Sequence, residues 1–161
     1  MKKMVLGLMC LCILPVSLFA DMSKAELQQM YLDYLRSQNI SAEIEEEYGD
    51  IVFRYGERQM TCFIEIQENY PQVFRITWGD YFSIKTPADM ATMPHAACYA
   101  TGRAAYAKVY LDTKDNIIRE GDKIKASAEV YLVSPGDFKD VFYELMGGIE
   151  YALEQFATLM K

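Results

Sequence analysis

The stretch from residue 138 to residue 160 restricts the fold most, because it carries a long apolar stripe at helical spacing. The stripe consists of Phe138, Val141, Phe142, Leu145, Ile149, Leu153, Phe156 and Met160. Residues spaced three and four apart lie on one side of a helix, so this stretch predicts an amphipathic helix. A stripe this wide needs an apolar cover, which the rest of the chain must supply. The pair Gly147-Gly148 lowers helix propensity and predicts the close approach of another backbone.

The middle of the chain supplies this cover, because its hydrophobic period changes to two. Alternating runs occupy residues 42–55, 60–66 and 72–78 in a first group, and 105–111 and 124–132 in a second. Short polar or glycine-containing segments separate them. Such runs joined by turns are typical of antiparallel strands with one apolar face and one polar face.

Two more helices are expected outside these runs. Residues 22–37 repeat apolar side chains at helical spacing after Ser23, a plausible N-cap with Glu26 three residues later. The second helix starts near Pro87 and reaches about Gly102, and Pro94 is expected to kink or restart it. The resulting order is α-βββ-α-ββ-α, an α+β fold in which helices cover an antiparallel sheet.

This order of elements, together with three segments, resembles the YbjN-like family, whose fold is that of type III secretion chaperones. The segments are YGDIVFRYGERQMTCFIEI, AKVYLD and FKDVFYELMGGIEYALEQF. The resemblance implies a non-enzymatic binding or regulatory module. In the chaperone relatives the domain dimerises and holds an extended partner segment against its surface. Those relatives are cytoplasmic, so the resemblance carries over the mode of binding and not the client.

Residues 1–20 indicate export. Lys2 and Lys3 precede a short apolar run, and the small residue Ala20 stands before Asp21. This pattern is typical of a signal peptide cleaved between Ala20 and Asp21, and the run is too short for a permanent membrane span. We therefore expect a periplasmic or secreted protein with a single domain over residues 21–161.

The N-terminal segment has two alternative fates. Leu18 is an unusual residue three positions before the end of a signal, which leaves retention as an uncleaved anchor open. Cys10 or Cys12 could mark a lipoprotein, but the apolar stretch before either cysteine is brief.

The charge of the mature chain limits its partners. Without Lys2 and Lys3 it keeps 14 basic residues against 23 acidic ones, a net charge of about −9. Binding to nucleic acid or to an anionic membrane relies on clustered Lys and Arg, so both are disfavoured as main ligands. A protein, a peptide or a neutral ligand is favoured.

The mature chain keeps two cysteines, Cys62 and Cys98. In an oxidising compartment they could form one disulfide. They could equally be two buried thiols that act as small hydrophobic residues, because a bridge requires Cα atoms within about 7 Å.

No catalytic, cofactor or metal site is predicted, and we expect a protein that is not an enzyme. His95 is the only histidine and has no nucleophile motif around it. With Cys98 it supplies only two metal ligands. The acidic run from Glu43 to Asp50 lacks the loop pattern of a calcium site, and a solvated strand edge is the better interpretation.

Aromatic residues are the remaining candidates for function. If Phe74, Tyr106, Tyr110 and Tyr131 lie on the sheet face away from the helices, they form an exposed patch suited to a peptide or a second subunit. Alternatively, helices cover both faces or the tyrosines lie singly. The leading hypothesis is an exported, non-catalytic protein-binding module that forms a homodimer. The alternative is a periplasmic carrier of a small hydrophobic ligand, with a pocket between the sheet and the Met-rich second helix at Met90 and Met93.

Overall fold

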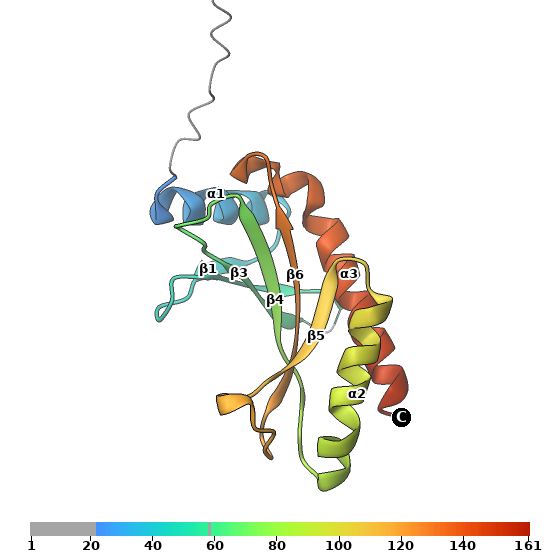
Figure 1. Ribbon diagram of the computed structural model, residues 1–161. Coiled ribbons are helices and arrows are strands. Elements are labelled where there is room, and N and C mark those ends of the chain that lie inside the picture. The colour runs from blue at the N-terminus through green and yellow to red at the C-terminus, as the bar shows by residue number, and fades with distance from the viewer. Residues whose placement is uncertain (1–21, 58) are drawn as a thin grey trace, which may run out of the picture.

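The computed structural model describes residues 22–57 and 59–161 (Figure 1). Its helices are α1 (Lys24–Ser37), α2 (Pro87–Arg103) and α3 (Phe138–Leu159). Its strands are β1 (Ala42–Ile44), β2 (Ile51–Tyr55), β3 (Met60–Glu65), β4 (Val73–Ser83), β5 (Ala107–Asp112) and β6 (Lys123–Tyr131). Two 3₁₀ turns, η1 (Lys114–Asn116) and η2 (Pro135–Asp137), precede β6 and α3. The predicted signal peptide and its cleavage site at Ala20 and Asp21 lie outside the described residues.

The six strands form one sheet in the order β1-β2-β3-β4-β6-β5, and every neighbouring pair is antiparallel. This confirms the predicted α+β class with an antiparallel sheet. The run 42–55 is not one strand as predicted, because a turn divides it into β1 and β2. The carboxylate of Glu45 accepts hydrogen bonds from the backbone N–H groups of Glu47 and Tyr48, and Gly49 adopts a positive φ of 76°. These interactions stabilise a reversal that the alternation alone did not indicate.

Local signals fix where the first two helices begin. Ser23 and Glu26 form a capping box at α1, and Thr86 and Asp89 form the same motif at α2. The α2 helix continues through Pro94 up to Arg103, so the expected restart at this proline is not observed. None of the helices within residues 22–57 and 59–161 is long and apolar enough to cross a membrane.

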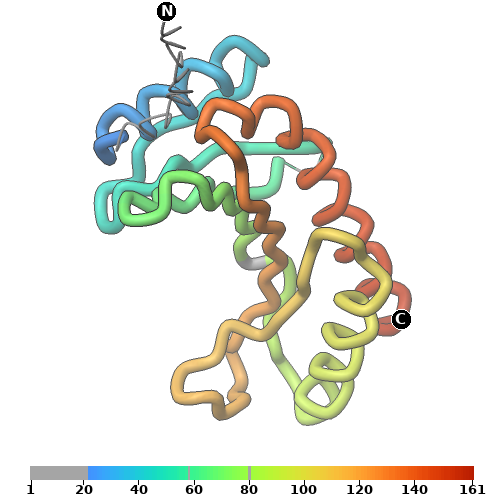
Figure 2. The backbone as a smooth tube through the Cα atoms, turned by 45° about the horizontal axis from the view of Figure 1, so that its top comes forward, coloured from blue at the N-terminus to red at the C-terminus, as the bar shows by residue number. Residues whose placement is uncertain are grey.

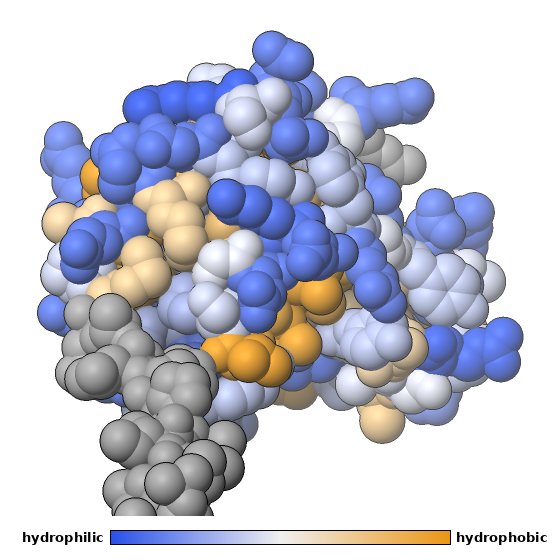
Figure 3. All heavy atoms as spheres, turned by 90° about the horizontal axis from the view of Figure 1, so that it is seen from above, coloured by the Kyte–Doolittle hydropathy of each residue, from blue (hydrophilic) through white to orange (hydrophobic). Residues whose placement is uncertain are grey.

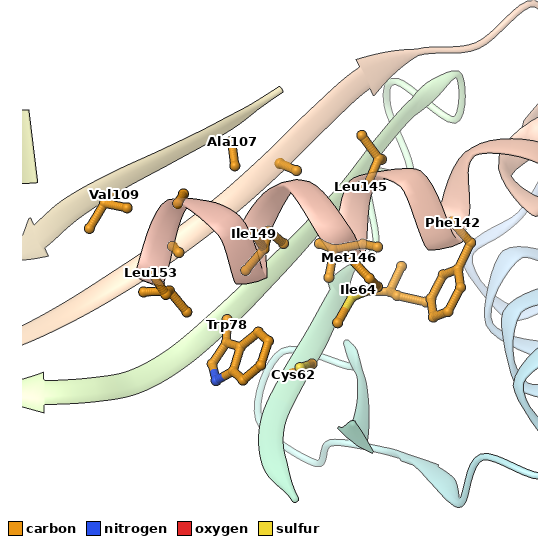
Figure 4. Close-up of a cluster of buried hydrophobic side chains, with 14 of the residues drawn as sticks. Cys62, Ile64, Trp78, Ala107, Val109, Phe142, Leu145, Met146, Ile149 and Leu153 are labelled. Carbon is orange, nitrogen blue, oxygen red and sulfur yellow. The ribbon is translucent and has the colours of Figure 1, made fainter. Parts of the chain in front are cut away.

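The core lies between the helices and one face of the sheet, and Figure 4 shows part of it. Its sheet side is built by cross-strand neighbours such as Ile64 with Ile76 and Trp78 with Ala126. The α3 stripe covers this face as predicted. Phe142 packs on Phe53 with ring centres 5.9 Å apart.

All three helices pack on this apolar face. Tyr31 of α1 meets Phe74 of β4 and Phe138 of α3, with ring centres 5.6 and 4.7 Å away. Small residues of α2, including Ala96 and Ala100, are buried where α2 lies beside α3 (Figure 2).

The predicted close approach of another backbone is found at neither glycine of α3. A Cβ on Gly148 would lie 3.9 Å from Cβ of Tyr106, so a side chain and not a backbone approaches it. A Cβ on Gly147 would have no described atom within 4 Å, so the prediction is wrong there.

Candidate functional site

The second face of the sheet has no described helix packed on it, and we call it the bare face. At its centre three pairs of residues stand opposite each other on β4 and β6: Val73 with Tyr131, Arg75 with Glu129, and Thr77 with Ser127. Thr77 and Ser127 are buried although no helix covers them. Longer side chains stand next to them on the same face, including Arg75 on β4 and Tyr110 on β5. These side chains shield the two small residues from solvent.

Charged side chains pair with each other in the middle of the bare face. Arg75 Nη1 lies 2.8 Å from Glu65 Oε2, and the same guanidinium pairs with Glu129. Thr77 Oγ1 donates a hydrogen bond of 2.6 Å to the other oxygen of Glu65. One arginine thus joins carboxylates of β3 and β6 across β4, so this part of the surface is polar and ordered.

Apolar side chains project into solvent at one end of the bare face. Tyr131 is 73% exposed and Val133 is 78% exposed. We call this pair the exposed end. Figure 3 looks down on the α1 end of the molecule and shows apolar side chains interrupting a largely hydrophilic surface. Tyr131 ends β6 on the bare face and Val133 follows two residues later, and two neighbouring apolar residues this exposed suit contact with another macromolecule.

The four predicted aromatic residues do not form one patch. Phe74 is fully buried, because it points to the same helix-covered side of β4 as Ile76 and Trp78. Its predicted exposure is therefore wrong. Tyr106 precedes β5 and lies beside Gly148 of α3 with 55% of its surface exposed.

The other two predicted aromatic residues, Tyr110 and Tyr131, do belong to the bare face. Tyr110 stands opposite Lys125 on β6 and is half-buried, and burial raises the pKa of its hydroxyl. Val133 was not among the predicted residues, although continuing the alternation two residues past Tyr131 would have found it.

Cys62 and Cys98 are both free in the structure. Cys62 is buried in β3, and this burial raises the pKa of its thiol to about 12. Cys98 is exposed on α2. The structure therefore contains neither the disulfide nor the pair of buried thiols.

The other polar candidates lie apart from the bare face. His95 is exposed on α2, three residues before Cys98. Among the residues that the structure describes, no three His, Cys, Asp or Glu side chains gather into a potential metal site. Glu43 belongs to β1, the strand at one edge of the sheet, where the acidic run was expected.

A groove of about 760 Å³ opens between the β2–β3 turn and the last turns of α3. It does not involve Met90 or Met93, the residues predicted to line a ligand pocket. Met93 is fully buried in the core and Met90 packs against the core. The groove contains Glu57, Glu150 and Glu154 in its lining, which is unlike the apolar pocket predicted for a hydrophobic ligand.

These features define a class of fold: a two-layer α+β domain whose helices cover one face of an antiparallel sheet and leave the other bare. A solved structure with this fold is that of YbjN from E. coli, a protein proposed to be a transcription regulator. The likeness covers 86% of this chain and 94% of that chain, with a TM-score of 0.56 and 12% sequence identity. The fold is therefore YbjN-like, as the sequence suggested. No family model matches the sequence, and no curated protein matches it either.

Proposed function

We propose that this protein is an exported, non-catalytic protein-binding module that holds a partner polypeptide on its bare face. The observation that carries the proposal is the exposed end, where Tyr131 and Val133 project beside the paired charges of Arg75 and Glu129. Apolar area surrounded by ordered polar groups is the usual composition of a protein interface. The exposed ring of Tyr131 supplies a large contact area at a small cost in side-chain entropy.

The first partner that we expect is a second copy of the chain. A twofold interface must be self-complementary, and the bare face carries both signs of charge next to an apolar end. In such a dimer Arg75 of one copy approaches a carboxylate of the other, and the exposed ends become buried. The family resemblance also implies a dimer.

The test uses light scattering coupled to size exclusion on the mature chain, residues 21–161, over the micromolar range. We expect a dimer, and we expect the double variant Tyr131→Ser/Val133→Ser to elute as a folded monomer. The control is Tyr48→Ser, which removes a similarly exposed tyrosine from the β1–β2 turn and should leave the dimer intact.

A second measurement keeps the test informative if the protein binds only other proteins. A photoreactive phenylalanine analogue at position 131 should cross-link a polypeptide in a periplasmic extract, whereas the same analogue at position 48 should not. A monomeric protein with no cross-link specific to position 131 would contradict the proposal.

Export is the other part of the proposal, and it is supported by the pattern of residues 1–20. Mass spectrometry of the protein recovered from the periplasm or medium of a bacterial host should give a chain that begins at Asp21. Recovery of the intact chain from the cytoplasm would overturn this part alone.

A further inference from the structure

The groove beside the end of α3 is a second surface, away from the bare face, and its lining combines carboxylates with aromatic rings. Glu150 and Glu154 stand one helical turn apart on α3, and Glu57 faces them from the β2–β3 turn. Lys161 is the single basic residue among the described residues of the lining. Among these described residues negative charge is in excess, which attracts cations.

Glu150 reaches across the groove toward the β2–β3 turn. Its Oε1 lies 3.2 Å from where a Cβ on Gly56 would stand, and Gly56 has a positive φ of 71°. Glycine is thus favoured at this position both by the backbone and by the carboxylate beside it. Within the described residues, no hydrogen bond or ion pair satisfies the Glu150 carboxylate.

Aromatic residues form the walls and floor of the groove, and the core holds them in place. The ring of Tyr55 packs edge-on against Phe142, and that of Tyr81 packs edge-on against Phe156. Tyr81 reaches the helix side because the β4–β6 register shifts between Trp78 and Phe82. Such a bulge turns a side chain that strict alternation would place on the opposite face.

Trp78 contributes an unsatisfied donor at the floor. Its side chain is only 5% exposed, and Nε1 has no hydrogen-bond partner among the described residues. Figure 4 shows the indole next to Leu153, with its nitrogen on the side away from Cys62. A buried N–H without an acceptor is unfavourable, and a ligand that supplies an acceptor would remove this cost.

We infer that this groove binds an arginine side chain of a partner polypeptide, with the guanidinium between Glu150 and Glu154. Trp78 Nε1 is itself buried, so the indole shifts on binding to let a backbone carbonyl of the peptide accept from it. Arginine suits this lining because its planar cation stacks on aromatic rings and donates to two carboxylates at once. Lysine can supply only the charge, so it should bind more weakly. The inference does not depend on the proposed role of the bare face.

The experiment uses Trp78 as the reporter, because it is the only tryptophan in the chain. The peptide acetyl-Gly-Arg-Gly-amide is titrated into residues 21–161 while the indole N–H resonance and the fluorescence are recorded. We expect both signals to move in a saturable way. The peptide with citrulline in place of arginine keeps the shape but lacks the charge, and it should bind about tenfold more weakly or not at all.

Matched variants show which carboxylates take part. The double variant Glu150→Gln/Glu154→Gln should weaken arginine-peptide binding by about tenfold or more, and Glu144→Gln, an exposed change elsewhere on α3, should not. Neither variant alters a core residue.

Three results would overturn the inference: a Trp78 signal that does not respond, an equal response to the citrulline peptide, or an unchanged affinity in the double variant. Free arginine amide should bind more weakly than the peptide, because it lacks the flanking backbone that meets Trp78. Equal affinities would overturn the assignment to a polypeptide. The oligomeric state of the Tyr131→Ser/Val133→Ser variant is read separately, so either proposal can fail without the other.

Discussion

The two faces of the sheet are built from the same strands in the same register, yet their residues have opposite roles. On β4, Phe74 and Ile76 are fully buried under the helices, while their neighbours Val73 and Arg75 lie on the bare face. On β6, Ala128 is buried and Tyr131 is mostly exposed. Stability is therefore concentrated on one face, and the other can change its side chains for binding at little cost to folding.

The largest expected effect contrasts two aromatic truncations, one on each side of the sheet. Phe142→Ala should lower the free energy of unfolding by about 3–5 kcal/mol, because it leaves a cavity against Phe53 and Tyr34. Tyr131→Ser should change it by no more than about 0.5 kcal/mol. Urea unfolding of residues 21–161 measures both. If the two variants lost similar stability in monomeric protein, the contrast between the faces would be wrong.

A smaller effect is expected from the charges of the bare face. Arg75→Met keeps most of the side-chain length but removes the pairing with Glu65 and Glu129, whose side chains are 27% and 41% exposed. We expect a loss of about 0.5–1 kcal/mol that shrinks at high salt, because solvent screens the pairs.

Urea unfolding at low and high salt measures the loss in the Arg75 variant, and Arg75→Lys, which keeps the charge, should lose less. A salt-independent loss above about 3 kcal/mol would mean that these charges behave as a buried network and the bare face is a second core.

The smallest expected effect on stability concerns Glu150, which lines the groove and is partly exposed to solvent. Burial, with a contribution from the charge of Glu154, raises the pKa of Glu150. The folded protein therefore favours the neutral form of Glu150. This contribution to stability is fully present at pH values below the ordinary carboxyl pKa, and it is lost as the pH rises through the raised pKa of the folded protein.

Glu150→Gln should accordingly be more stable than the parent at neutral pH by about 0.3 kcal/mol, the scale of a like-charge pair one turn apart. The difference should vanish below about pH 4, where the parent is also neutral at this position. Thermal unfolding across this pH range measures it, with Glu144→Gln as the exposed control. A Gln variant less stable than the parent at neutral pH would mean that the carboxylate has a favourable partner.

The sequence predicted the elements of the core well, because burial follows simple periods. The α3 stripe and the alternation on β3 and β6 both lie where expected, and the predicted capping pair Ser23 and Glu26 marks the start of α1. The division of residues 42–55 was missed, because the Glu45 side chain stabilises the turn through contacts that no periodicity reports.

The candidate sites were less predictable, because each depends on which face a strand presents. Phe74 was assigned to the wrong face although its alternation with Arg75 was visible, since the sequence does not say which face the helices cover. Tyr81 lies on the helix side only because of the bulge in β4, and a change of register leaves no mark in a period-two pattern. The groove joins a turn near Gly56 to the end of α3, a contact between distant parts of the chain that sequence reasoning could not anticipate.

The pairing of β4 with β6 also bears on how the molecule folds. Strands β1 to β4 follow one another and can pair through short turns, whereas Tyr131 meets Val73 only after residues 74–130 have been laid down between them. Closing so long a loop is costly in chain entropy and slow compared with hairpin formation. We therefore expect the pairing of Tyr131 with Val73 to form late, so that a partner recognising both residues would bind only chains that have completed folding.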